Sequence, residues 1–566
     1  MALFEKESKK EIKLSDSDKT LLSKLEVRID EGLAIRRTKK AEWRKYLRFF
    51  GGDQYNSIGV RLPPYKSNIF VNKVFATFRS LIALETDAKP SPIVNSRIRE
   101  DEQVKEDVIK ANKKVESALD DIWDLRQVPL TLTEIYYDRY IFADGYGMYF
   151  WNNVDQDVDF EQIKPQELLR SAGSTSIDDA EFLIVEKWRN RKYFQDNFPD
   201  KVNKIKFTDK PLIKFDENED EEVDGAERKN MALVYHYFQD DIWITKSGKE
   251  ILSKKKNPFW EWRTVEEQTK EIQERFNGEV PDGWQPIRNH LMKPKKHIVH
   301  FKGYHLGGSF ESVSLMKQII GLNVNVNKRK GQIQDILNGT GSPQWIIDPS
   351  VPEAKVRQIT SKPGIKIRVN PDLIRKEPAS QPPQFTLEDL LHSERKFDDI
   401  AGLHEVSRGS TPRKRITKGE AEILRESDIT PIRLLVRNSE AAIIDLLNGW
   451  VQLMKLFYDQ PHYVGRLGQR SLETYGEDLI REEIPDNLTI TVKVGSTLPV
   501  SKESRRSQFI QDFQLGAIDL LSYLEAMDYP NPEKIYERVL KQQAAQPATP
   551  DQPAKLPKVA PLGETK

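Results

Sequence analysis

The first part of the chain is organised by apolar residues that recur at every third or fourth position. Between residues 15 and 50, Leu21, Leu25, Ile29 and Leu33 follow this spacing, which aligns side chains along one face of an α-helix. We therefore expect a long helix over residues 15–50. The same kind of pattern predicts further helices over residues 68–85, 101–125 and 130–144.

A different pattern begins at residue 145, where aromatic and β-branched residues cluster between turn-forming residues. Such runs are typical of β-strands. They predict strands over residues 145–151, 182–188, 231–238, 241–245 and 297–301, with charged insertions of low periodicity at residues 200–230 and 253–295. Helices followed by strands in this order predict an α+β fold.

Residues 309–402 are expected to form a long helix, a short β module and a second helix. The first helix is predicted over residues 309–337 and is ended by the glycines and proline that follow it. Two short apolar runs bounded by prolines, residues 345–347 and 365–369, predict a pair of strands. The second helix is expected to begin at Thr386 and to end at Gly402, because glycine adopts the left-handed conformation that closes a helix. This order describes a stalk that carries a small β knob.

A basic segment follows the second helix directly. Residues 404–418 carry one acidic residue, Glu405, against five basic ones, a net charge of +4. The five are Arg408, Arg413, Lys414, Arg415 and Lys418. The segment contains Gly and Pro and is too polar for a core, so we expect a flexible loop. Thr417 and Glu420 have the spacing of a capping box, which predicts that a helix begins there.

That helix is expected to reach about Asp459, with a kink at Pro431 because proline removes a backbone hydrogen bond. Residues 484–500 have a strand-like pattern, and residues 501–543 predict two or three short helices. Residues 544–566 are rich in Pro, Ala and Gln, a composition that predicts a disordered tail.

Composition narrows the class of protein. Lys+Arg and Asp+Glu each number 88, so the formal net charge is zero, whereas a protein that wraps DNA normally carries a large basic excess. Any contact with DNA is therefore expected to be local.

The chain has no cysteine, which removes disulfides, thiolate zinc sites and cysteine nucleophiles. No apolar run approaches the ~20 residues that span a bilayer, and residues 1–19 lack the apolar core of a signal peptide, so we expect a cytosolic protein or a particle assembled in the cytosol.

The motifs of common catalytic sites do not occur in the sequence. It has no H-E-x-x-H pair, no G-x-x-x-x-G-K-[ST] phosphate loop and no G-x-S-x-G nucleophile elbow. We interpret His297 and His300 as part of an ordinary strand rather than as metal ligands, and the acidic residues 216–224 as a solvated loop rather than a calcium loop. We expect no enzymatic activity, no cofactor and no metal site.

Four local phrases, in this order, resemble the portal proteins of tailed bacteriophages. The first is Asn68-Ile-Phe-Val-Asn-Lys followed by a helix and Lys89-Pro-Ser-Pro. The second is Asp178-Asp-Ala-Glu-Phe-Leu-Ile-Val-Glu-Lys-Trp. The third is Ala401-Gly-Leu-His-Glu-Val-Ser-Arg-Gly-Ser with Thr417-Lys-Gly-Glu-Ala, and the last is Ala526-Met-Asp-Tyr-Pro-Asn-Pro. The resemblance extends over roughly residues 30–543. It departs from the family at residues 171–173, where Ser-Ala-Gly stands in place of an Asp-Pro pair common in other members.

The resemblance implies a multidomain portal fold and a ring, typically of twelve subunits. It assigns residues 1–29 to an N-terminal arm, 30–308 to an α+β wing, 309–338 and 386–403 to two stem helices and 339–385 to a β-containing clip. It assigns residues 404–418 to a tunnel loop that faces DNA, 419–500 to a long kinked helix and the return of the wing, 501–543 to a helical crown and 544–566 to a disordered tail. The loop's five basic residues would meet phosphates, and such contacts carry no sequence information.

The partners implied by the resemblance are those of a capsid vertex. They are double-stranded DNA without sequence specificity, the terminase, the major capsid and scaffolding proteins, and head–tail adaptor proteins. The protein would belong to the virion, be assembled in the bacterial cytoplasm and contact no membrane. The alternatives are another ring-forming head–tail connector, most of which are much shorter, and a packaging nuclease or ATPase. For residues 404–418 the plain alternative is a solvated surface connection.

Overall fold

The computed structural model describes residues 16–86, 89–90, 92–96, 106–210, 228–239, 242–256, 269–270, 273, 296–341, 345–359, 368–376, 383–402, 432–464, 477–485, 488–492, 509–518 and a few positions between 520 and 539. The chain divides into two compact units. The first comprises Met1–His462 with Leu479–Leu498, and the second comprises Tyr463–Asp478 with Pro499–Lys566. In the second unit, the rings of Phe513 and Tyr523 stack 4.6 Å apart.

A six-stranded antiparallel sheet forms one side of the first unit. Its strand order is β4-β5-β7-β8-β9, and β6 pairs with β7. The strands are β4 (Leu168–Arg170), β5 (Leu183–Asn190), β6 (Thr208–Lys210), β7 (Arg228–Phe238), β8 (Ile242–Ser247) and β9 (Glu250–Lys256). Helix α6 (Arg191–Asn197) and the 3₁₀ turn η2 (Pro199–Lys204) follow β5.

Helix α1 (Asp16–Phe50) covers one face of this sheet. Its residues Leu25 and Ile29 are buried against Phe182, Ile184 and Tyr237. This burial accounts for the apolar spacing seen in the sequence and confirms the helix expected over residues 15–50. The expected boundary between arm and wing, at residue 29, falls inside α1.

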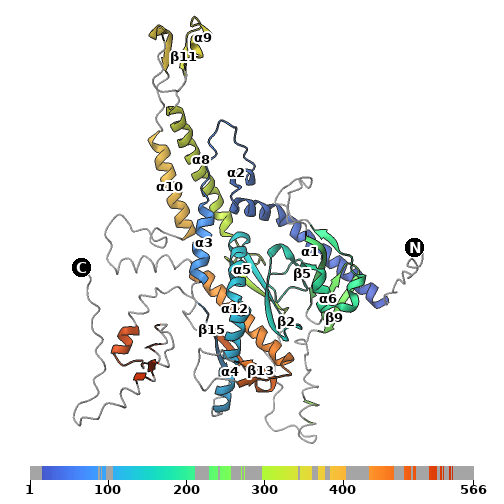
Figure 1. Cartoon of the computed structure of the whole chain (residues 1–566). Helices are drawn as coiled ribbons and strands as arrows, with labels where there is room; N and C mark the ends of the chain where they lie inside the picture. The colour runs from blue at the N-terminus through green and yellow to red at the C-terminus, as the bar shows by residue number, and fades with distance from the viewer. Residues whose placement is uncertain are drawn as a thin grey trace, which may run out of the picture. The chain divides into compact units, whose positions relative to one another are not determined.

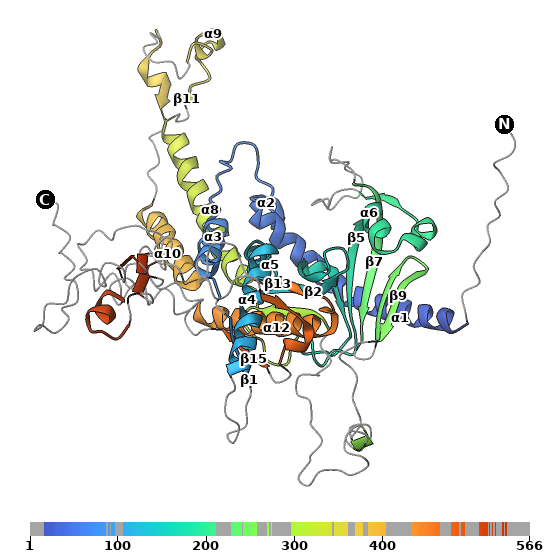
Figure 2. The same ribbon diagram turned by 60° about the horizontal axis from the view of Figure 1, so that its bottom comes forward.

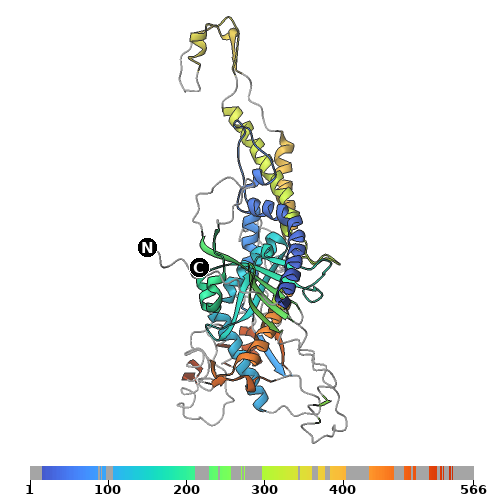
Figure 3. The ribbon, with the colours of Figure 1, turned by 90° about the vertical axis from the view of Figure 1, so that its right-hand side faces the viewer.

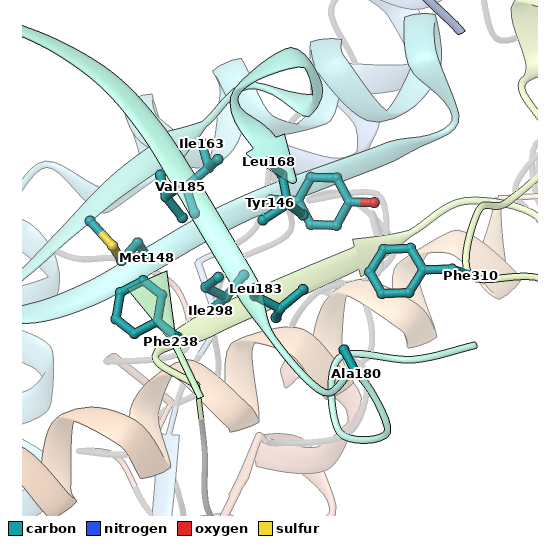
Figure 4. Close-up of a cluster of buried hydrophobic side chains, with 10 residues drawn as sticks. All are labelled: Tyr146, Met148, Ile163, Leu168, Ala180, Leu183, Val185, Phe238, Ile298 and Phe310. Carbon is teal, nitrogen blue, oxygen red and sulfur yellow. The ribbon is translucent and has the colours of Figure 1, made fainter. Parts of the chain in front are cut away.

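The opposite face of the sheet packs against a second, three-stranded sheet with the order β10-β2-β3. Its strands are β2 (Asp144–Asn152), β3 (Asp157–Ile163) and β10 (Ile298–Lys302). Figure 4 shows the core between the two sheets, where Tyr146, Met148 and Ile298 meet Leu183 and Val185. Successive residues of β5 therefore enter different cores, as the two-residue period of a strand requires.

Helices complete the first unit. They are α2 (Gln54–Ser57), α3 (Lys73–Thr86), α4 (Glu106–Leu125), α5 (Val128–Phe142) and α12 (Arg433–Phe457). Helix α12 packs against β10 and β2, as Figure 2 shows. The approach is close at Gly449, where an added Cβ would lie 2.4 Å from the ring of Tyr149. Strand β1 (Pro92–Ser96) pairs with β15 (Leu488–Val492).

The remaining elements are short or belong to the stalk predicted from the sequence. The stalk consists of α8 (Leu315–Gly341) and α10 (Gln384–Ala401), with β11 (Trp345–Ile347), α9 (Glu353–Val356), η4 (Pro371–Leu373) and β12 (Ile374–Lys376) between them. Three further elements are β13 (His462–Val464), β14 (Glu477–Leu479) and η5 (Arg481–Glu483), and η1 (Pro165–Glu167) precedes β4.

Two sequence expectations were wrong in detail, and a third lies mostly outside the described residues. Residues 68–72 are not helical, because both backbone groups of Val71 are bonded to α8: its N–H donates to Asn327 and its carbonyl accepts from Asn323. Residues 309–314 are not helical: Val313 forms an isolated antiparallel bridge with Tyr304, and the carboxylate of Asp144 binds both the N–H and the hydroxyl of Ser312. Strand β11 pairs with β12, which the sequence did not predict; of the strand expected over residues 365–369, residues 365–367 lie outside the described residues and residues 368–369 form no strand.

Candidate functional site: a helical hairpin beside a basic segment

Helices α8 and α10 form an antiparallel pair, which we call the hairpin; Figures 1 and 3 show the two helices side by side. Asn325 donates from Nδ2 to Ser393 Oγ over 2.7 Å. One turn further along α8, Arg329 Nε lies 2.5 Å from Asp389 Oδ2. Because the residue number on α10 falls as the residue number on α8 rises, the two helices run in opposite directions. Phe397 is completely buried at this contact.

A second contact is made by a row of polar side chains on α8, spaced four and eight residues apart. Asn323, Asn327 and Asp335 accept hydrogen bonds from the backbone N–H groups of Lys73, Val71 and Ser67, at 3.1, 2.8 and 2.8 Å. Positions four apart share one face of a helix. Residues 67–72, which we call the strap, are therefore held along α8.

Individual bonds show how specific the strap's attachment is. Asn323 and Asn327 are almost fully buried, and both donate from Nδ2 to Oε1 of the buried Gln54. The N–H of Ser67 and a further hydrogen bond from the Ser67 side chain hold the pKa of Asp335 below its usual value. Asn323 and Asn327 each use both their amide oxygen and their amide nitrogen, which favours one register of the strap on the helix.

The two helices of the hairpin carry opposite net charge. Helix α8 has four basic residues and one acidic residue, a net charge of +3, and α10 has five acidic and two basic residues, a net charge of −3. Several of these pair within the chain, including Lys330 with Glu394 at 2.9 Å. The hairpin also exposes apolar side chains, namely Leu337, Phe385, Leu387, Leu391 and Ile400, each about half exposed. A lone chain therefore leaves part of the hairpin's apolar surface in water.

The module between the hairpin helices, residues 345–376, is small and basic. Strands β11 and β12 pair antiparallel, with Trp345 opposite Lys376 and Ile347 opposite Ile374. Trp345 and Ile346 are adjacent in the strand, so their side chains lie on opposite faces, and both are about half exposed. Two strands alone are marginally stable in water, so this module leaves apolar surface for a further contact.

The basic residues that the sequence singled out, Arg408, Arg413, Lys414, Arg415 and Lys418, all lie outside the described residues. So do Pro431, where a kink was expected, and residues 403–431 as a whole. The structure describes both flanks of this segment. Helix α10 ends with Gly402 in the left-handed conformation at φ 69°, as predicted. On the other side, α12 begins at Arg433.

The two histidines considered as possible ligands have structural partners. His300 lies in β10 and places Nε2 2.8 Å from Asp144 Oδ1. Burial alone would raise the pKa of Asp144, but His300 and the two donors of Ser312 lower it below its usual value. His297 precedes the strand and stacks on Tyr149. Among the described residues, no group of three His, Cys, Asp or Glu side chains is placed to hold a metal ion.

A cleft of about 1360 Å³ opens beside the two sheets and includes His236 and His297 in its walls. Burial lowers the pKa of His236 to about 4 and that of His297 to about 3. Both rings are therefore neutral at pH 7 and serve as packing groups there.

Within the part of the chain that the structure covers, no helix is both long and apolar enough to cross a bilayer.

Comparison with known proteins shows no similarity in sequence. No known protein family matches the sequence, and no curated protein sequence is significantly similar to it. Among solved structures, a chain from the neck of an empty GTA particle, computed with C6 symmetry, is similar with a TM-score of 0.38. The two chains are 10% identical, and the similarity covers 78% of this chain and 89% of that chain. The function proposed below does not rest on this similarity.

The sequence indicated the hairpin but not the residues that hold it. The four-residue spacing of Asn323 and Asn327 inside an apolar helix was the available signal, because asparagine disfavours a helix interior unless its side chain is engaged. Neither the ion pair of Lys73 with Asp398 nor that of Glu85 with Arg139 has a sequence signal. Lys73 and Asp398 are more than 300 residues apart in the sequence, and in each pair the two residues lie on different helices.

Proposed function

We propose that this protein is the subunit of a bacteriophage portal, a ring through which double-stranded DNA enters and leaves a capsid, and that it has no enzymatic activity. The observation that carries the proposal is the order of parts. An α+β body leads into an antiparallel hairpin with a basic β module, and a segment of net charge +4, residues 404–418, follows the hairpin after Gly402. This order supports the stem, clip and tunnel-loop assignments made from the sequence.

The surface of the hairpin supports association of identical copies. Leu387 and Leu391 lie one turn apart on α10 and are about half exposed, so their burial between copies would be favourable. The net charges of α8 and α10 are opposite. Contact between α10 of one copy and α8 of the next would therefore be electrostatically favourable. A contact between two different surfaces repeats around a ring when its rotation closes.

The proposal includes the partners of a portal. The basic segment would contact the phosphates of passing DNA, and the zero net charge of the whole chain would let the DNA slide. The module between the helices would dock first the terminase and then head–tail adaptor proteins. A ring of about twelve copies at one vertex of a virion would match this assignment. A different ring-forming head–tail connector is the alternative that the same hairpin surface favours.

The test of the proposal is the assembly state of the purified full chain. We expect native mass spectrometry and negative-stain microscopy to show closed rings, each many times the 65.6 kDa of one chain, with a central channel. The Leu387→Ser/Leu391→Ser variant should form fewer rings, while Val27→Ser, at an exposed valine of α1, should assemble normally. A chain that stays monomeric or dimeric at high concentration and at several salt concentrations would overturn the portal assignment.

A further inference from the structure

Helix α3 is bonded at its first residue to both helices of the hairpin. The N–H of Lys73 donates to Asn323 of α8. Its Nζ lies 3.0 Å from Asp398 Oδ1 and donates to the carbonyl of Glu394 at 3.2 Å, both on α10. The ammonium group also lies 4.9 Å from the centre of the Phe397 ring. One side chain thus joins the start of α3 to the last two turns of α10.

The other end of α3 is connected to the start of α12 through a side chain of α5. The buried carboxylate of Glu85 binds Arg139 and Tyr140 of α5. Arg139 in turn donates from Nη1 to Ser439 Oγ at 2.6 Å and to the carbonyl of Leu435 at 3.4 Å. Leu435 and Ser439 lie in the first two turns of α12. The far end of α3 therefore reaches α12 through a single buried arginine.

These two attachments bracket the basic segment of the sequence. Asp398 precedes Gly402, the last described residue before residues 403–431, by four positions, and Leu435 lies four positions after residue 431. The attachments are twelve residues apart on α3, or about 18 Å along the helix axis. Helix α3, together with Arg139 of α5, therefore connects the two flanks of the segment that carries Arg408, Arg413 and Lys414.

We propose that α3 is a brace that sets the separation between the two attachment points of the basic segment, and that Lys73 is its positioning residue on the hairpin side. A displacement of the hairpin is then passed through Lys73 to α3 and through Glu85 and Arg139 to α12. The role of the segment in contacting DNA rests on the function proposed above, whereas the brace itself does not.

The two ends of the brace differ in strength. Glu85 and Arg139 are both almost fully buried, and a buried ion pair is screened little by salt. Lys73 and Asp398 are 13% and 22% exposed, so their attraction is weaker and depends on ionic strength. The attachment that yields under load is therefore the one at Lys73, and the brace stays fixed on α12.

The test measures the distance between the two flanks. The chain has no cysteine, so Ile400→Cys with Leu434→Cys introduces two labelling sites at side chains that are about half exposed. Nitroxide labels at these sites, in full-length protein diluted with unlabelled chains, give a distance distribution by pulsed electron paramagnetic resonance. We expect a narrow distribution for the parent protein and for Lys73→Arg, which keeps the charge. Lys73→Gln should broaden it at least twofold.

The matched control removes an ion pair from the same hairpin without touching α3. Lys330→Gln breaks the contact with Glu394 and should leave the distribution narrow. A narrow distribution in Lys73→Gln, or equal broadening in Lys330→Gln, would overturn the brace. Because the readout involves no DNA and no ring count, a failure of the portal assignment leaves this result unaffected, and the reverse also holds.

Discussion

At the scale of single residues, several charges are taken out of water and then held by specific partners. Burial would disfavour the guanidinium of Arg139, yet Glu85 raises its pKa further above the usual value, and it therefore stays charged. Breaking such a pair by removing one partner leaves the other charge buried alone, which is strongly destabilising. These pairs therefore fix how helices meet, more than they add net stability.

Asp138 on α5 shows the opposite behaviour. Burial raises the pKa of its carboxyl to about 7, although Gln162 donates a hydrogen bond to it at 2.7 Å. The folded state thus binds this proton more tightly than the unfolded chain, whose Asp pKa is about 3.9. The stability contributed by the proton is complete below pH ~4 and is lost as the pH rises toward 7.

We therefore expect Asp138→Asn, which stays neutral, to be more stable than the parent protein at pH 8, by about 1–3 kcal/mol. At pH 4 the two should differ by less than about 0.5 kcal/mol. Urea unfolding at both pH values measures this. Asp196→Asn, at an exposed position of α6, serves as the control and should show no such pH dependence. A difference between Asp138→Asn and parent that is the same at pH 4 and pH 8 would contradict the argument.

At the scale of elements, the strap depends on side chains of α8 that replace the partners a helix or sheet would supply. The N–H of Val71 is bonded by the buried Asn327, and backbone groups buried without a partner cost about 1–3 kcal/mol. The same α8 row therefore defines where the strap lies and keeps residues 67–72 from forming another turn of α3.

We expect Asn327→Ala to release the strap without unfolding the hairpin. In hydrogen–deuterium exchange, the amides of Ser67 and Val71 should exchange at least tenfold faster than in the parent protein, equal to about 1.4 kcal/mol of lost protection. Asn325→Ala is the matched control, because Asn325 bonds Ser393 of α10 and no strap residue. Slow exchange at Val71 in Asn327→Ala would show that the row does not hold the strap.

At the scale of the whole molecule, charge is balanced overall and concentrated locally. The chain has 88 basic and 88 acidic residues, while residues 404–418 carry a net charge of +4. A ring built from such chains would hold its basic groups where the segments meet. Contacts of this kind with phosphates weaken steeply with salt, so the grip on DNA would be local and adjustable.

We expect Arg413→Gln/Lys414→Gln/Arg415→Gln to form rings of normal mass and to package or retain at least tenfold less DNA in a reconstituted head. A three-charge control is Lys249→Gln/Lys254→Gln/Lys255→Gln, at exposed positions of β9 and the turn before it, and it should package normally. Normal packaging by the first variant would remove the tunnel-loop role from residues 404–418. Equal loss in both variants would indicate a general effect of charge.

Local patterns in the sequence determined much of the element order. Helix α1 was predicted because its apolar stripe is long and regular, and the end of α10 because Gly402 adopts a conformation that other residues disfavour. Strands β2, β5 and β7 were predicted because their aromatic and β-branched runs are long enough to show. The basic segment was identified from charge alone, which requires no fold.

Only the tertiary structure decided the features that depend on contacts between residues distant in the sequence. Strand β12 has a single apolar residue, Ile374, followed by Arg375 and Lys376, whereas all three residues of β11 are apolar, so β12 was missed. Residues 68–72 have apolar spacing that also suits a helix, and the bonds from Asn323 and Asn327, about 250 residues away, keep them from forming one. The brace at Lys73 and Glu85 has the same origin, because an ion pair between distant residues exists only once packing brings them together.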